Sequence, residues 1–403
     1  MRDRFRKVVT LGLPLLCVAG ASLHGGDEKT KSMKAVETEI DASEKIQWKK
    51  HTVLPKMNGV HFSAAAADFT GDGKIDVIGS VLAKTILFTA PDWKQQEIHA
   101  FTDRGARHVA AEPMDIDEDG DLDLVGGTAS EHLIWLENPS KLGAPWVEHI
   151  IDDETAGIHC IILFDVNKDG KLDVISNNFK SKGPLGNSCT WYEMSKATNG
   201  TVVWKRHIFA KGDASGGSHY IGAGDVNGDG WPDLAVAAKG KPFDHGNWYA
   251  YWVNPGEGKV EEPWEKVLLL EDQIGATNIQ MVDVNDDGTM DFICTNGHGK
   301  GVFWLEMPSK TIHMIDVEMA CPHNLTVSDF NDDGVLDFAT NGFKSQRASV
   351  YYGKIGSFKR VDIDTSQKSY DLKSIDMDGD GDLDILNAGQ ASGNICWYEN
   401  PVK

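Results

Sequence analysis

Short apolar runs alternate with polar turns along the chain from residue 47 onward. Runs such as KIDVIGS, DLDLVGG, KLDVISN and TMDFICT are rich in β-branched residues and follow a Gly/Asp-rich segment. Runs of this length and composition predict buried strands. Each is preceded by a small-residue segment such as HFSAAAADF and followed by an aromatic one such as LIWLENP and an outer one such as WVEHII. Four strands in every unit predict the blade of a β-propeller.

The unit occurs seven times, with successive starts 46 to 60 residues apart. A period of this size indicates a radial repeat and not a string of independent domains. The last unit ends at WYENPVK without an outer strand, whereas QWKKHTV at 47–53 is an outer strand with no unit of its own. Pairing these two segments removes the exposed edges. We therefore predict an all-β fold, a seven-bladed β-propeller of four-stranded blades over residues 47–403, with 28 strands and a ring closed by the N-terminal strand.

The first residues have a different pattern. A basic start, an apolar run from Val8 to Ala19 and small residues up to Ala21 predict a signal peptide over residues 1–21. Residues 22–46 are polar and are interpreted as a tether. No later apolar run is long enough for a membrane span, so we expect an exported periplasmic or extracellular protein. The odd number of cysteines left after Cys17 argues against a disulfide framework.

An acidic nine-residue segment of the type DVNKDGKLD stands between the first two strands of every unit; we call these segments the acidic loops. Oxygen side chains at positions 1, 3, 5 and 9 with Gly at position 6 form the pattern of a calcium loop. Hard oxygen donors without His or Cys suit Ca²⁺. The predicted ligands are Asp68, Thr70, Asp72, Asp76, Asp115, Asp117, Asp119, Asp123, Asp165, Asn167, Asp169, Asp173, Asp225, Asn227, Asp229, Asp233, Asp283, Asn285, Asp287, Asp291, Asp329, Asn331, Asp333, Asp337, Asp376, Asp378, Asp380 and Asp384.

A single copy of this segment is equally well explained as an Asx-rich turn without an ion. Seven copies with the same ligand positions favour up to seven calcium ions, with the weakest site in the first loop, where Thr70 stands at position 3. Bound calcium also explains how the fold tolerates a formal net charge of −22. The same charge argues against nucleic acid or an anionic membrane as a partner.

The acidic loops, each followed by a strand, resemble the FG-GAP/VCBS-type repeats of integrin α-subunit heads and exported bacterial proteins. The resemblance covers residues 47–401 and implies the propeller fold and calcium binding. The WLENP and W-x-x-H-x-I strands, together with a His before the loop, resemble the propeller part of aldos-2-ulose dehydratase, which eliminates water from a ketosugar. That enzyme also has cupin domains, which this chain lacks.

Histidines recur at the start of the innermost strand, on the face opposite the acidic loops. The catalytic candidates are His61, His108, His159, His219 and His323. His61 and His108 lie seven residues before their loop and the other three lie six before, and a shift of one residue turns a strand side chain to the other face. His159, His219 and His323 are therefore the stronger candidates. The outer-strand His51, His149 and His207 are expected to face solvent.

Connections that open on the same face carry basic residues, which makes the predicted site a His/Lys-lined funnel. The ligand-binding candidates are Lys180, Lys241, His245, His298, Lys344 and Arg347, with Asn278 and Asp371 at the strand starts that lack His. Each residue alone is more often structural or solvated than functional, and it is the set of five histidines around one axis that favours a site. The aromatic residues of the third strands are interpreted as packing between blades.

Two classes of function fit these patterns. In one, the propeller is a calcium-stabilised module that binds a carbohydrate, another anionic ligand or a protein in the funnel without chemistry. In the other, the funnel is the site of a carbon–oxygen lyase, a dehydratase or polysaccharide-lyase type acting on sugars, in which a neutral His or a Lys takes a proton and a His-bound metal such as Zn²⁺ stabilises the enolate. The sequence does not choose between them, and it gives neither the ligand nor the oligomeric state.

Overall fold

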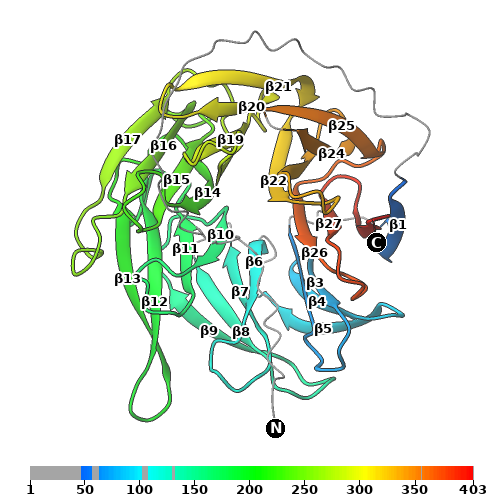
Figure 1. The fold of residues 1–403 in the computed structure, drawn as a ribbon. Coiled ribbons are helices and arrows are strands. Elements are labelled where there is room, and N and C mark those ends of the chain that lie inside the picture. Colours follow the sequence, from blue (N-terminus) through cyan, green and yellow to red (C-terminus); the bar gives the residue numbers. More distant parts are fainter. Residues whose placement is uncertain (1–46, 57–62, 102–107, 129–131, 355, 403) are drawn as a thin grey trace, which may run out of the picture.

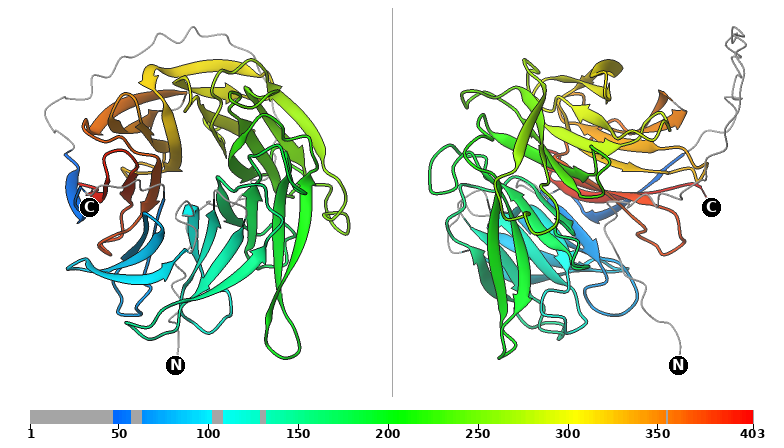
Figure 2. Two further views of the ribbon diagram at one scale, coloured as in Figure 1. Left: turned by 180° about the vertical axis from the view of Figure 1, so that it is seen from behind. Right: turned by 60° about the vertical axis from the view of Figure 1, so that its left-hand side comes forward.

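The structure is a computed structural model that describes residues 47–56, 63–101, 108–128, 132–354 and 356–402. Seven four-stranded antiparallel sheets are arranged around a central axis (Figures 1 and 2). This confirms the predicted seven-bladed propeller. The proposed signal peptide, the tether and His61 lie outside the described residues. Within the described residues, no helix is long and apolar enough to cross a membrane.

The strands of the first four blades follow the predicted order. Blade 1 is β2 (Ala64–Ala67), β3 (Asp76–Val81), β4 (Lys84–Thr89) and β5 (Lys94–Ala100); blade 2 is β6 (His108–Met114), β7 (Asp123–Thr128), β8 (Leu133–Glu137) and β9 (Val147–Asp152); blade 3 is β10 (Ile161–Phe164), β11 (Asp173–Asn177), β12 (Cys189–Lys196) and β13 (Val202–Ala210); blade 4 is β14 (Ser218–Gly224), β15 (Asp233–Ala238), β16 (Trp248–Val253) and β17 (Glu265–Leu270).

The last three blades complete the ring. Blade 5 is β18 (Asn278–Val282), β19 (Asp291–Thr295), β20 (Lys300–Glu306) and β21 (Thr311–Ala320); blade 6 is β22 (Pro322–Ser328), β23 (Asp337–Gly342), β24 (Arg347–Lys354) and β25 (Ser357–Asp364); blade 7 is β26 (Asp371–Ile375), β27 (Asp384–Gly389), β28 (Asn394–Glu399) and β1 (Lys49–Leu54). β1 pairs antiparallel with β28, with His51 opposite Trp397, so the N-terminal strand completes blade 7 as predicted (Figure 1).

Apolar side chains between neighbouring blades form the core. The second strand of every blade is buried along its whole length, for example Asp233–Ala238 in blade 4. Its two faces pack against the blades on either side, which is why these strands are near-continuous apolar runs instead of alternating ones. The five described cysteines are all buried and unpaired. Among the described residues, the fold therefore rests on packing and hydrogen bonds and not on disulfides.

Three blades are joined to the preceding blade by an asparagine that follows the third strand. The Asn138 side chain donates to the Phe69 carbonyl of the preceding acidic loop (2.9 Å) and to the Leu122 carbonyl of its own blade (3.1 Å). Asn254 and Asn400 do the same in blades 4 and 7. We call these residues the asparagine staples. They explain why ENP or VNP follows the aromatic strand in these units.

The outer-strand histidines are less solvated than expected: His207 is buried, and His51 and His149 are partly exposed. Each stacks on the third-strand tryptophan opposite to it, as His207 does on Trp191 with ring centroids 3.9 Å apart. His51 on Trp397 and His149 on Trp135 repeat the arrangement. A glutamate two residues after the tryptophan bonds the ring nitrogen, so the WxE and His positions form one cross-strand unit. The third-strand aromatics are packing residues, as predicted.

Candidate functional site

Three histidines meet at the mouth of the central channel, where innermost strands begin. His159 lies two residues before β10, His219 is the second residue of β14 and His323 is the second residue of β22. The ring centroids of His159 and His219 are 3.6 Å apart, and those of His219 and His323 are 4.9 Å apart. The three residues that the register singled out are thus the three that come together. We call them the histidine cluster.

One ring nitrogen of each cluster histidine is held by a neighbour. His159 Nε2 is 2.9 Å from the Tyr370 hydroxyl, and His323 Nδ1 is 3.0 Å from the Tyr370 carbonyl. His219 Nε2 is 2.9 Å from His298 Nε2. Such bonds fix the ring orientation and the tautomer of histidines that ligate metals.

The other ring nitrogen of each histidine is buried without a hydrogen-bond partner among the described residues: His159 Nδ1, His219 Nδ1 and His323 Nε2. A buried polar atom left unpaired costs about 1–3 kcal/mol. One ring nitrogen from each of the three lies within 4.8 Å of the others, close enough for a shared ion. The donor set of three imidazoles suits Zn²⁺ or a similar transition metal and leaves a coordination position open.

The protonation state of the cluster histidines also suits a bound cation. Burial, together with nearby Lys239 and His298, holds the pKa of His159 well below its usual value. Burial and the neighbouring histidines do the same to the pKa values of His219 and His323. All three are therefore neutral at pH 7, so that metal binding does not have to displace protons.

His298, one of the predicted ligand-binding residues, belongs to the same site. It comes from the connection between β19 and β20, and its side chain reaches solvent. The surrounding protein, Lys239 and Lys344 lower its pKa to about 4. His298 is therefore a neutral, accessible base beside the cluster.

Sequence reasoning missed four residues of the site. Tyr370 and Tyr220 bracket His323, with the Tyr220 hydroxyl 3.3 Å from its Nδ1. Lys239 lies over the Phe243 ring (5.8 Å), and burial lowers its pKa. Asn177 accepts the amides of His159 (3.0 Å) and Cys160 and donates to the His219 carbonyl (2.9 Å). Only Asn177 had a sequence signal, because an apolar strand ends in two asparagines.

His108 does not join the cluster. A register irregularity follows it in the pairing of β6 with β7, and its ring lies against Gly126 of its own blade and against Phe101. The extra residue before the acidic loop thus turns the ring away from the cluster, as the register argument anticipated. Burial lowers its pKa to about 3. Its role as a catalytic candidate is corrected to a packing role.

The other ligand-binding candidates divide into two groups. Asn278 and Asp371 form a buried chain through Asn324, with Asn278 Nδ2 2.9 Å from Asn324 Oδ1 and Asn324 Nδ2 2.5 Å from Asp371 Oδ1. These residues, with His159 and Tyr220, line a channel cavity of about 160 Å³. Arg347 is paired with Asp362 (3.2 Å). Lys180, Lys241, His245 and Lys344 lie in the connections between second and third strands, where they were expected.

The acidic loops lie at the other end of the innermost strands. In each, the amide at position 7 donates to the position-5 carboxylate, as from Lys171 to Asp169 (2.8 Å). The glycine at position 6 has φ between 79° and 103° in all seven loops, which is the backbone conformation that requires glycine. Asp115, Asp117 and Asp119, and also Asp376, Asp378 and Asp384, bring carboxylate oxygens within 4.8 Å of one another.

The position-9 aspartates have a structural part as well. Each is at most 1% exposed, and each accepts a backbone amide from the start of its own loop, as Asp233 does from Val226 (3.1 Å). Burial raises the pKa of Asp123 and of Asp173 to about 8, a cost that an adjacent cation offsets. The loops thus fit calcium in donor type and conformation, and calcium stays a prediction.

Comparison with known proteins identifies the repeats. The FG-GAP-like repeat model matches residues 115–176 and 225–294, which lie in blades 2, 3, 4 and 5. No curated protein matches the chain. The comparisons leave the likeness to aldos-2-ulose dehydratase a prediction.

Solved structures of low identity share the fold. BBS1N in complex with ARL6DN is 12% identical, with 88% of this chain and 97% of that chain covered at a TM-score of 0.56. Virginiamycin B lyase from Staphylococcus aureus, a catalytically inactive form with quinupristin, is 13% identical, with 88% and 99% covered at 0.54. YCF48 bound to D1 peptide is 12% identical, with 89% and 96% covered at 0.54. At these identities the likeness extends to the fold alone.

Proposed function

Since the chain is a seven-bladed propeller with FG-GAP-like repeats, we propose that its chemistry lies at the histidine cluster, as a metal-dependent carbon–oxygen lyase acting on an anionic carbohydrate. The observation that carries the proposal is the convergence of three buried, neutral imidazoles: one ring nitrogen of each lies within 4.8 Å of the others, and each ring has a nitrogen without a partner among the described residues. A divalent transition metal held by His159, His219 and His323 would act as a Lewis acid on a substrate carbonyl or carboxylate.

The residues around the cluster supply the other parts of an elimination. Lys239 and Lys344 place positive charge beside His298, which suits a uronate or another acidic sugar. Neutral His298 takes the proton α to the carboxylate, the electron pair forms the new carbon–carbon double bond, and the β carbon–oxygen bond breaks. Lys239, whose pKa is lowered by burial, donates a proton to the departing oxygen.

Metal analysis and turnover test this proposal together. We expect about one equivalent of a transition metal per wild-type chain, loss of that metal in the His159→Ala/His219→Ala/His323→Ala variant, and retention of it in His298→Ala. On polyuronates, the wild type should form an unsaturated product and both variants should not. If the protein contains no transition metal and does not turn over acidic glycans, the lyase proposal is wrong.

A binding function without chemistry is the second candidate. Two of the structural neighbours are described with protein ligands, ARL6DN and D1 peptide. In this second function, the same channel mouth binds a glycan or a protein segment without a reaction. The acidic loops then contribute only to stability. Tight binding of an acidic oligosaccharide without product formation, in a sample loaded with zinc, would favour it.

Two further expectations belong to the same proposal. The acidic loops would bind up to seven calcium ions, with positions 1, 3 and 5 as ligands and position 9 closing the shell. The amino-terminal pattern would direct export, which suits calcium loops because extracellular calcium is abundant enough for weak sites. Sequencing the N-terminus of the exported protein, with Ser22 as the expected first residue, checks the second point.

A further inference from the structure

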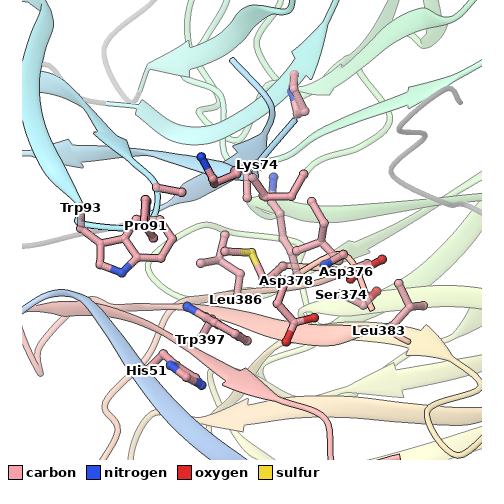
Figure 3. Close-up of a pocket in the computed structure, with 18 of the residues that line it drawn as sticks. His51, Lys74, Pro91, Trp93, Ser374, Asp376, Asp378, Leu383, Leu386 and Trp397 are labelled. Carbon is pink, nitrogen blue, oxygen red and sulfur yellow. Dashed lines mark hydrogen bonds between the residues drawn. The ribbon is translucent and has the colours of Figure 1, made fainter. Parts of the chain in front are cut away.

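A second and larger cavity lies between blade 7 and blade 1, on the side of the acidic loops. It has a volume of about 610 Å³, within the range of small-molecule sites. Figure 3 shows Pro91 and Trp93 from blade 1 on one side and Leu386 and Trp397 from blade 7 on the other. We call it the blade 7–1 cavity. It adjoins the loops, at the opposite end of the innermost strands from the histidine cluster.

The cavity occupies the place of a missing asparagine staple. In blades 2, 4 and 7, the residue whose amide bonds the position-9 aspartate is an asparagine. In blade 1 that residue is Ala90, whose amide donates to Asp76 (2.9 Å). The two carbonyls that an asparagine would bridge here belong to Met377 and Ile75, and both residues line the cavity. A methyl group has replaced two hydrogen-bond donors.

The walls combine aromatic surface with hydrogen-bonding groups. Trp93 is only partly buried and keeps ring surface for a ligand. Trp397 is 6% exposed, and its indole N–H has no partner among the described residues. Polar groups at the wall include Lys74, Ser374 and Asp376, and the paired Glu112 and Lys373 line the cavity as well. A neutral ligand with one apolar face and several hydroxyl groups is the best match to this mixture of aromatic surface and hydrogen-bonding groups.

The geometry points to the blade 7–1 cavity as a binding site for one neutral saccharide unit. The C–H face of a sugar ring packs on Trp93, and its hydroxyls donate to the Met377 and Ile75 carbonyls left by the missing staple and bond Lys74 and Ser374 at the wall. A purely apolar ligand would offer no donor to the two carbonyls, and an anionic one would meet the acidic loop of blade 7. The site does not depend on the histidine cluster.

Titration calorimetry with maltose, cellobiose and chitobiose tests this inference on the mature chain in calcium-containing buffer. Wild type should bind at least one of the three. Trp93→Ala removes the stacking surface and should weaken binding by about tenfold or more. Ala90→Asn should restore a staple that occupies the two carbonyls, and should weaken binding. Asp92→Ala, an exposed change beside Trp93, is the matched control and should bind as wild type does.

The outcomes separate this site from the proposed lyase site. Binding that persists in the His159→Ala/His219→Ala/His323→Ala variant but is lost in Trp93→Ala supports the inference, whether or not the protein has lyase activity. Absence of binding to all three disaccharides overturns it. Binding that survives both Trp93→Ala and Ala90→Asn, or that disappears with the histidine cluster, also overturns it. If Ala90→Asn does not fold, Trp93→Ala against Asp92→Ala decides.

Discussion

At the scale of single residues, the histidine cluster depends on one buried amide. Asn177 bonds the backbone of His159, on its own blade, and the carbonyls of Ser218 and His219, on the next. It therefore sets the distance between two of the three predicted metal ligands. The side chain of Asn178, its neighbour, accepts the Ala156 amide instead (2.7 Å).

Asn177→Ala should weaken metal binding by about 10- to 100-fold, because outer residues that orient ligands have effects of that size. Its free energy of unfolding should also fall by about 1–3 kcal/mol. Metal titration and chemical denaturation measure the two effects. Asn178→Ala is the control, with a comparable loss of stability and unchanged metal affinity; equal metal affinities in the two variants would exclude a positioning role for Asn177.

His108 makes a residue-scale prediction about pH. Its pKa is about 3 in the folded protein because of burial, and an unfolded histidine titrates near 6.5. As pH falls below about 6.5 the unfolded chain takes up a proton that the folded chain does not, so stability falls until about pH 3. The slope from this one group is about 1.4 kcal/mol per pH unit.

His108→Gln should remove that slope. The stability difference between wild type and variant, from denaturation at pH 7, 6, 5 and 4, isolates the one group from the many carboxylates that titrate in the same range. His149→Gln, at a partly exposed position, is the control. A difference that stays constant with pH would show that His108 is not buried as described.

At the scale of elements, the blade is an antiparallel sheet that needs fixed contacts to its neighbours. The asparagine staples supply them in blades 2, 4 and 7, and the WxE–His units join third to outer strands in blades 2, 3, 5 and 7. In blade 4 Lys266 takes the place of the histidine, over Trp252 (4.9 Å). The blades are therefore similar in plan and different in detail.

Asn254→Ala should lower the free energy of unfolding by about 1–3 kcal/mol, since it leaves the buried carbonyls of Val166 and Pro232 without their donor. Urea denaturation followed by tryptophan fluorescence measures the loss. Gln95→Ala, the loss of an exposed amide, should change stability by less than about 0.5 kcal/mol. A loss no greater in Asn254→Ala than in Gln95→Ala would contradict the staple.

At the scale of the whole molecule, the ring places two kinds of chemistry at opposite ends of the same strands. In blade 4, Asp225 lies six residues after His219, which at ~3.3 Å per residue corresponds to roughly 20 Å. His219 is the second residue of β14, and Asp225 follows the end of this strand. The oxygen side chains of the predicted calcium sites and the imidazoles of the proposed transition-metal site thus lie at opposite ends of the propeller.

Calcium removal tests the acidic end across all blades. A chelator should lower the melting temperature of the mature protein substantially, because seven clusters of carboxylates then repel one another without an ion. The histidine-cluster variant should show the same drop, since it retains every acidic loop. An unchanged melting temperature in chelator would contradict the prediction that calcium stabilises this fold.

The fold was largely predictable because each blade is local in sequence. Strand type follows from apolar runs, and the acidic loops recur with the same spacing, so the count of seven and the closure by β1 both followed from the chain. The cluster histidines were predictable because strand register is a matter of counting. His108 follows the same rule: one extra residue between it and its acidic loop turns its ring away from the cluster.

What the tertiary structure alone decided is how residues from different blades meet. Tyr370 reaches His159 across 211 positions of sequence, and Lys373 pairs with Glu112 (2.6 Å) across the channel. No periodicity records such contacts. The blade 7–1 cavity is likewise invisible in the sequence, where Ala90 is one more small residue. Patterns within a blade recur from unit to unit, so they can be found by comparing the units of the sequence. A contact across the central axis, or a cavity between two blades, depends instead on how the ring closes.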